Sequence, residues 1–182
     1  MPFIVAHGLI PVMVVDFSKR YSRKLKKSVN RKNLAICGLA GIAPDFDIIF
    51  SFLVNLFIPL GNLHRTFTHS VFSVIPVLLL ALALKRWRTP LLFAAIGWAS
   101  HTALDVLLTG TVPLLYPLPY QFGLQILTDR ITSTTILYVA GLDIAVLASW
   151  IFYKKLFFWP SPAAGKNQKQ VSAKKVYSRN RR

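Results

Sequence analysis

The chain has 182 residues, of which 54% are hydrophobic and 15% are charged, and its formal net charge is +16. This composition excludes a disordered chain, which needs low hydrophobicity, and the single cysteine excludes a disulfide-rich secreted domain. A soluble nucleic-acid binder is seldom so apolar, so we expect no specific nucleic-acid partner. The remaining class is a small, basic, integral membrane protein that contacts membrane lipid.

Five apolar segments alternate with basic clusters along the chain. They are Pro2–Phe17, Leu34–Leu60, Ser70–Leu84, Thr89–Thr109 and Ile131–Tyr153. A helix needs about 20 residues to cross a bilayer, so the second, fourth and fifth segments are long enough. The first and third are short, and either span a thin bilayer, tilt, or re-enter. The pattern predicts an all-α, polytopic membrane bundle of about five apolar helices over residues 1–153, with a basic, disordered tail over 154–182.

The basic residues predict how the bundle is oriented. Of the 22 Lys and Arg residues, 20 lie in three stretches, Lys19–Lys32, Lys85–Arg88 and Lys154–Arg182. Two apolar segments separate each stretch from the next. Because cytoplasmic loops carry an excess of positive charge, we expect five crossings, the amino terminus outside, and the basic loops and carboxyl terminus in the cytoplasm. The expected location is the cytoplasmic (inner) membrane of a prokaryote.

Histidine and aspartate side chains gather at one depth of this predicted bundle. Counted from the nearest cytoplasmic basic residue at 1.5 Å per residue, five of them lie about 18 to 26 Å from the cytoplasmic edge. They are His7, Asp45, His69, His101 and Asp105. This layer is in the outer half of a core about 30 Å thick, so we expect a site that opens toward the outside. Ionisable groups at such depth are costly unless they are paired or ligated.

Two local patterns favour a metal site. His101 and Asp105 are one helical turn apart and share a face, although a histidine simply hydrogen-bonded to an aspartate would fit equally well. Pro44 predicts a break in the second segment, with Asp45 and Asp47 at the start of the new helix. These two acids point to different sides, so they need not bind the same ion. An aspartate that caps a kinked helix explains one of them but not both.

Other polar residues each have more than one candidate role. His64 lies further out and could act outside the ligand set or as a proton donor. Arg65 could hold a substrate phosphate or carboxylate, or could anchor its helix at the interface. Asp143 either orients a ligand histidine or pairs with Arg130, and a structural role is favoured. The uncharged, proline-rich stretch Gly110–Thr128 is expected to dip into the interface beside the site.

These motifs together resemble those of the YdjM-like family, described as LexA-regulated, membrane-bound metal-dependent hydrolases. The matching pieces are His7-Gly8, Gly41-Ile42-Ala43-Pro44-Asp45-Phe46-Asp47, His64-Arg65-Thr66-Phe67-Thr68-His69-Ser70 and Ser100-His101-Thr102-Ala103-Leu104-Asp105. That family is distantly related to zinc-dependent phospholipase C and P1-type nucleases. The resemblance implies a phospholipase C-like helical core, with His7, Asp45, His69, His101 and Asp105 as metal ligands. Those soluble enzymes also use a glutamate, which this chain lacks, so we expect one or two ions rather than three.

The leading functional hypothesis is a membrane-bound metal-dependent hydrolase of a lipid or lipid-linked phosphoester. Zinc is the expected ion, with manganese as an alternative, because the ligands are imidazoles and carboxylates. Asp47 or His64 would transfer protons, and Arg65 would bind an anionic group. Two other hypotheses stay open: a small ion, proton or solute transporter that uses Asp and His within the membrane, and a non-catalytic protein with a structural metal. The sequence does not indicate an oligomeric state.

Overall fold

The computed structural model describes residues 4–61, 63–108, 110–124 and 133–158. Apart from one isolated β-bridge between Val112 and Phe122, these residues form helices and connecting segments. This confirms the all-α bundle of apolar helices. The chain divides into two compact units, Met1–Leu147 and Ala148–Arg182. The site lies in the first unit, to which the following description applies.

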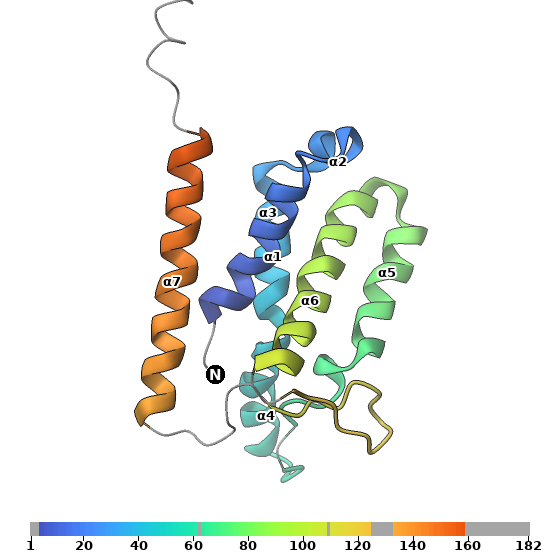
Figure 1. Cartoon of the computed structure of the whole chain (residues 1–182). Coiled ribbons are helices and arrows are strands. Elements are labelled where there is room, and N and C mark those ends of the chain that lie inside the picture. The colour runs from blue at the N-terminus through green and yellow to red at the C-terminus, as the bar shows by residue number, and fades with distance from the viewer. Residues whose placement is uncertain (1–3, 62, 109, 125–132, 159–182) are drawn as a thin grey trace, which may run out of the picture. The chain divides into compact units, whose positions relative to one another are not determined.

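The helices follow one another in chain order, and the longest connection leads from α6 to α7 (Figure 1). The α-helices are α1 (Ile4–Ser18), α2 (Arg23–Ser28), α3 (Arg31–Ile42), α4 (Asp47–Asn55), α5 (Val74–Ala83), α6 (Arg88–Leu108) and α7 (Ser133–Phe158). Short 3-10 helices are η1 (Ala43–Phe46), η2 (Phe67–His69), η3 (Val71–Ser73) and η4 (Lys85–Trp87). Helix α7 continues past the predicted end at Tyr153 and enters the second unit. The predicted tail beyond Phe158 lies outside the described residues.

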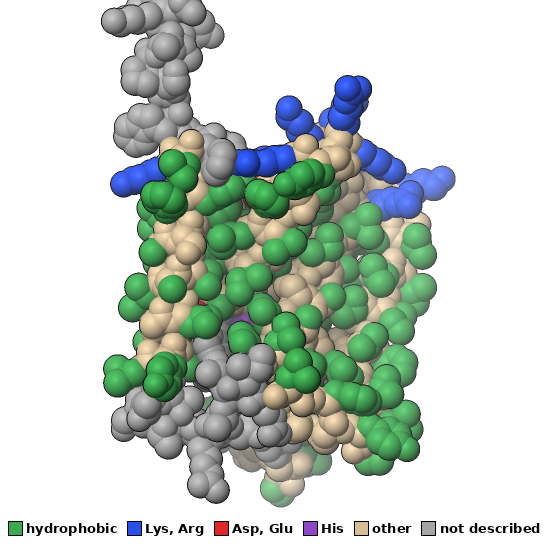
Figure 2. All heavy atoms as spheres, viewed as in Figure 1, with side chains coloured by type: hydrophobic (Ala, Val, Ile, Leu, Met, Phe, Trp, Pro, Cys, Tyr) green, Lys and Arg blue, Asp and Glu red, His purple; other side chains and the backbone are tan. Residues whose placement is uncertain are grey.

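Three helical stretches are long and apolar enough to cross a membrane. They are Arg31–Asn55, Lys85–Leu108 and Ile136–Leu156, and they correspond to the second, fourth and fifth predicted segments. The first and third segments form the shorter apolar helices Ile4–Ser18 and Val71–Ala83. Hydrophobic side chains cover the visible sides of the bundle (Figure 2). A bundle that exposes this much apolar surface is suited to a lipid surrounding.

The first two basic clusters lie at the same end of this unit. The ammonium nitrogen of Lys32 is 5.5 Å from the centroid of the Trp87 ring, which joins the start of α3 to the connection between α5 and α6. Figure 2 shows Lys and Arg side chains gathered at that end. At the end of α1, buried Asp16 pairs with Lys19. Two apolar segments separate these clusters in the sequence, so five alternating crossings would also place both clusters on the same side of the membrane.

Helices α1, α3 and α6 pack closely because glycines lie between them. A Cβ atom on Gly97 of α6 would overlap the carbonyl oxygen of Cys37, and one on Gly41 of α3 would overlap the carbonyl oxygen of His7. His101 is one helical turn beyond Gly97, so it lies on the same face of α6. The close backbone approach therefore brings His7 and His101 up against α3, where the site is built.

Candidate metal centre

The site begins where Pro44 interrupts the second apolar segment. Pro44 has no N–H for the helical hydrogen bond, and the chain passes from α3 through the 3-10 turn η1 into α4. The carbonyl oxygens at the end of α3 therefore need other donors. That of Gly41 accepts a hydrogen bond from Nδ1 of His101 at 2.8 Å. The predicted break is confirmed, and Asp47 is the first residue of α4.

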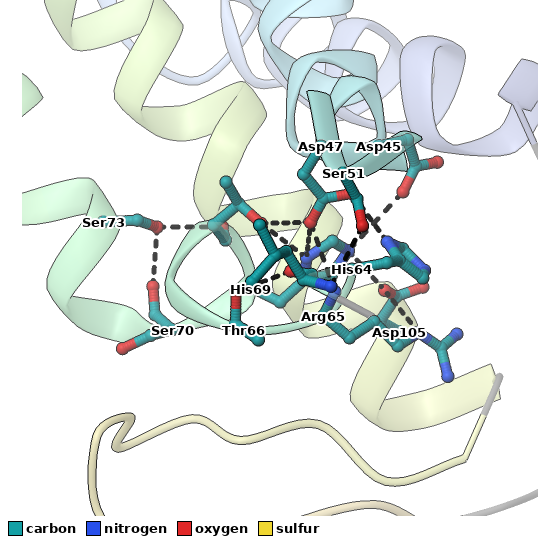
Figure 3. A network of polar contacts seen from close by, with 12 residues as sticks. Asp45, Asp47, Ser51, His64, Arg65, Thr66, His69, Ser70, Ser73 and Asp105 are labelled. Carbon is teal, nitrogen blue, oxygen red and sulfur yellow. Dashed lines mark hydrogen bonds and ion pairs between the residues drawn. The ribbon is translucent and has the colours of Figure 1, made fainter. Parts of the chain in front are cut away.

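Four of the five predicted metal ligands meet at one point. Asp45 comes from η1, His69 from η2, and His101 and Asp105 from α6. Each residue offers one donor atom, and we call these atoms the four-atom group. The Nε2 atoms of His69 and His101 are 3.1 Å apart. Oδ1 of Asp45 lies 3.5 and 3.2 Å from those two nitrogens, and Oδ2 of Asp105 lies 3.3 and 3.5 Å from them. Figure 3 shows several of these side chains converging from separate elements.

The spacing of these atoms fits a tetrahedral ion. Nitrogen and oxygen donors at about 2.0–2.1 Å from a tetrahedral Zn²⁺ are about 3.3 Å from one another. The five separations given above lie between 3.1 and 3.5 Å. In addition, both carboxylate oxygens of Asp45 are buried without a hydrogen-bond partner among the described residues. A buried carboxylate needs such partners or an ion, so these residues suit a divalent cation.

The other ring nitrogens of the two central histidines are engaged in a way that frees Nε2. Nδ1 of His101 donates to the Gly41 carbonyl. Nδ1 of His69 lies 3.0 Å from the hydroxyl oxygen of Thr68, which donates in turn to Asp47. Such second partners fix the tautomer of a metal-binding histidine and its ring orientation. Each Nε2 atom can then direct a lone pair at the common centre.

The charge around His69 is dominated by acids. Burial alone would lower the pKa of its imidazole, but the carboxylates of Asp45 and Asp47, 3.5 and 3.4 Å from its ring nitrogens, outweigh that effect and hold the pKa above its ordinary value. Without an ion, a proton on His69 therefore balances part of the negative charge. A divalent cation would replace this proton.

Asp47 has a different set of partners from Asp45. Its Oδ1 is 2.6 Å from Nδ1 of His64, and its Oδ2 accepts from the backbone N–H of Arg65 at 3.2 Å and from the Thr68 hydroxyl. Asp47, His64 and His69 form a second group that could hold a cation. Because the Asp47 oxygens already have these partners, the geometry favours a role in orienting His64 and His69.

Arg65 lies at the edge of the cluster in an uncommon backbone conformation. Its φ is 58°, in the left-handed region that non-glycine residues seldom adopt. The guanidinium Nε is 3.9 Å from Oδ2 of Asp105, and the side chain is half-buried. Figure 3 shows Arg65 extending toward Asp105. The structure thus places Arg65 beside the four-atom group, and the sequence had left open both an anion-binding and an interface-anchoring role for it.

His7 is the predicted ligand that the four-atom group does not include. Its buried Nε2 is 3.2 Å from Oδ1 of Asp105, whereas Oδ2 of the same carboxylate lies beside His69 and His101. Its ring centroid is 4.3 Å from that of His101. His7 is therefore placed to orient Asp105, or to bind a second ion that Asp105 would bridge.

The sequence matches a known family over most of its length. The family model described as YdjM inner membrane protein matches residues 1–165. The chain belongs to the YdjM inner membrane protein family. Membership agrees with the three helices long enough to cross a membrane and with the location predicted from the basic clusters. No curated protein and no solved structure matches the chain.

Two features of this YdjM-family site were not predicted from the sequence. One is a set of hydrogen bonds between α4 and the segment that follows it. The side-chain amide of Asn55 donates to the carbonyl of Gly61 and accepts from its N–H, and the Ser51 hydroxyl oxygen accepts from the N–H of Leu63 at 3.0 Å. These hydrogen bonds fold the chain back so that His64 and the residues after it reach the site. Their only sequence signal is two polar residues one turn apart in an apolar helix.

The second feature fixes the segment that carries His69. The hydroxyl of Ser70 and the backbone N–H of Val71 both donate to the carbonyl of Leu114. The indole N–H of Trp98 donates to the carbonyl of Thr68. The uncharged stretch after Asp105 therefore contacts the ligand-bearing turn, at least over the described residues 110–124. Its expected position beside the site agrees with these contacts.

Proposed function

We propose that this protein is a membrane-bound metal-dependent hydrolase of a lipid or lipid-linked phosphoester. The observation that supports this most directly is the proximity of three parts: four buried donor atoms at ion spacing, the His64–Asp47 pair, and Arg65. Two imidazoles with two carboxylates suit Zn²⁺, with Mn²⁺ as the alternative. One ion fits the four-atom group. A second ion could be bound either by His7 together with Asp105 or by the group of Asp47, His64 and His69.

A bound divalent ion would supply a nucleophile from water near neutral pH and would polarise a phosphoryl oxygen. The residues around it have separate tasks. Nδ1 of His64 is 2.6 Å from Oδ1 of Asp47, and this half-buried ring lies beside the four-atom group, where it would exchange a proton with the substrate. Asp47 would orient the ring and stabilise its charged form, as a carboxylate does for a general-base histidine.

Arg65 would bind the anionic part of the substrate. Its guanidinium presents several donors in a planar fork that matches phosphate. The backbone N–H of Arg65 is held by Asp47, so the same carboxylate fixes the positions of the proton-transfer residue and the anion-binding residue. Backbone strain of the kind seen at Arg65 is often found at functional sites.

The surroundings favour a lipid substrate over a water-soluble one. Phe46, between Asp45 and Asp47 in the sequence, is 59% exposed, and Phe67 beside Thr68 is 48% exposed. The uncharged loop that contacts the His69 turn also exposes Tyr116, Leu118 and Tyr120. A phosphoester attached to acyl or isoprenoid chains could keep its chains against these residues while its anionic group reaches Arg65.

One observation favours a structural ion as a second candidate function. Structural zinc sites are usually closed by four protein ligands, whereas catalytic sites keep an open position, and the present group offers four. Ion exchange without turnover would support that candidate. The contacts of His64 and Arg65 beside the group are the reason for preferring catalysis, because a purely structural ion needs neither residue.

The test is hydrolysis by protein reconstituted with Zn²⁺ or Mn²⁺ in vesicles that contain phosphatidic acid or phosphatidylglycerol. We expect release of inorganic phosphate or glycerol phosphate, loss of release in Asp45→Asn, and unchanged release in Ser100→Ala, whose hydroxyl bonds the Gly97 carbonyl instead of the site. Metal-loaded protein without turnover on either lipid would contradict the proposed substrates. Metal-dependent ion or solute uptake by the same vesicles would favour the transporter hypothesis.

A further inference from the structure

Asp143 is an acidic residue in a helix that contributes no ligand to the four-atom group. It lies in the middle of α7, whose candidate span Ile136–Leu156 is almost entirely exposed and apolar. Its Oδ1 accepts a hydrogen bond from the backbone N–H of Ala6 at 2.9 Å. An ionisable residue within a membrane helix is costly and needs a specific partner. Here that partner is the first turn of α1.

The contact caps α1 from another helix. Ala6 is the third residue of α1, and the N–H groups of a first turn have no acceptor within their own helix. A carboxylate at this position also interacts favourably with the helix dipole. The surroundings are apolar, because Ala6 and Val139 are buried together with Ile10, Leu108, Leu142 and Val146 packed against them. In apolar surroundings such a hydrogen bond is electrostatically stronger than it is in water.

From Ala6 the effect reaches the metal centre through the next residue. His7 is 1% exposed, and its Nε2 contacts Oδ1 of Asp105 at 3.2 Å. The other oxygen of Asp105 belongs to the four-atom group. A rotation or shift of the first turn of α1 would therefore move His7 away from Asp105. The capping hydrogen bond opposes such movement.

We propose that Asp143 is a positioning residue that sets metal affinity by holding α1, and with it His7, against Asp105. This inference rests on the metal centre of the proposed function. The α7 helix thereby acts on the site although it supplies no ligand to the four-atom group. The role requires a hydrogen-bond acceptor at residue 143, because the N–H of Ala6 is the group that it holds.

The experiment measures the zinc dissociation constant of detergent-purified protein by competition with a chelating indicator. Outer-shell partners of metal ligands typically change affinity by about 10–100-fold, so we expect about tenfold weaker binding in Asp143→Leu and a change within about twofold in Asp143→Asn, which keeps the acceptor. Asp16→Leu is the matched control, since Asp16 is a buried acid of α1 itself but lies at the other end of that helix from Ala6. It should leave zinc affinity unchanged.

A double-mutant cycle tests whether Asp143 acts through His7. We expect His7→Ala to weaken zinc binding, and Asp143→Leu to add little in that background, because residues that act in series are not additive. Full additivity would overturn the inference, as would tenfold weakening in Asp143→Asn or unchanged affinity in Asp143→Leu. Absence of zinc binding in the parent protein would instead overturn the metal centre itself.

Discussion

The Nε2 atoms of His69 and His101 face each other at 3.1 Å in the buried centre of the site. Because Nδ1 of each ring is directed at an oxygen, of Thr68 and of Gly41, both Nε2 atoms can be unprotonated. With both rings neutral, two lone pairs at this distance would repel each other, and either the proton that His69 holds without an ion or a divalent cation in its place removes this repulsion. The carboxylates of Asp45 and Asp105 reinforce this need for a positive charge, since they approach the same nitrogens.

The metal content of two neighbouring variants tests the centre directly. We expect about one or two equivalents of zinc or manganese per parent chain and none in His101→Ala, because removal of one imidazole leaves too few donors. Ser100→Ala should keep the parent content, because adjacent helical residues point in different directions and Ser100 bonds only the Gly97 carbonyl among the described contacts. Mass spectrometry on purified protein gives the answer. Equal metal in both variants would contradict the site.

The two aspartates near Pro44 should differ in their effect on metal binding. Asp45→Ala removes a donor atom of the four-atom group, so we expect loss of the ion. Asp47→Ala removes the partner of the Thr68–His69 hydrogen-bond chain, and such outer partners change affinity by about 10–100-fold. Zinc titration of both variants measures the difference. The assignment of roles is wrong if Asp47→Ala abolishes binding while Asp45→Ala does not.

Alanine substitutions at two glycines should have opposite effects on the stability of the protein. A Cβ on Gly97 would overlap the Cys37 carbonyl, so Gly97→Ala must push α3 and α6 apart, at a cost of about 1–3 kcal/mol. Gly141 of α7 has nothing within 4 Å of the position of its Cβ, so Gly141→Ala should be neutral or stabilising by about 0.4–1 kcal/mol. Denaturant unfolding in detergent compares the two. Similar destabilisation of both would argue against the close α3–α6 packing.

Labelling of introduced cysteines tests the predicted orientation. Cys37, the only cysteine, is buried, so the parent should not react with a membrane-impermeant maleimide. We expect Lys24→Cys and Arg86→Cys to react only after permeabilisation, because basic clusters remain cytoplasmic. Leu60→Cys, at an exposed position beyond α4, should react in intact cells. Reaction of Arg86→Cys from outside would reverse the orientation.

The sequence predicted the depth of the site residues but not their rotation about the helix axes. Counting from basic residues placed His7 and Asp45 in one layer, and the structure brings both close to Asp105. Whether the imidazole of His7 faces the four-atom group or Oδ1 of Asp105 depends on the rotation of α1 about its own axis. That rotation follows from the packing at Gly41, which requires the three-dimensional structure.

The break at Pro44 was predictable because proline acts on its immediate neighbours. The partners of Asp47 were not, since they include a backbone N–H and a hydroxyl from a turn that is folded back by Ser51 and Asn55. Nor did the sequence indicate that Arg65 has a left-handed backbone. Such features depend on long-range contacts rather than on local preference.

The carboxylate oxygens of Asp45, which have no hydrogen-bond partner among the described residues, imply a consequence for the protein in the cell if they bind an ion. A cation that binds only the folded chain raises the free energy of unfolding with its concentration. The apo form would therefore open more often and be degraded sooner by quality-control proteases. Under metal starvation the protein would disappear from the membrane even with constant synthesis, so its abundance would report the supply of its ion.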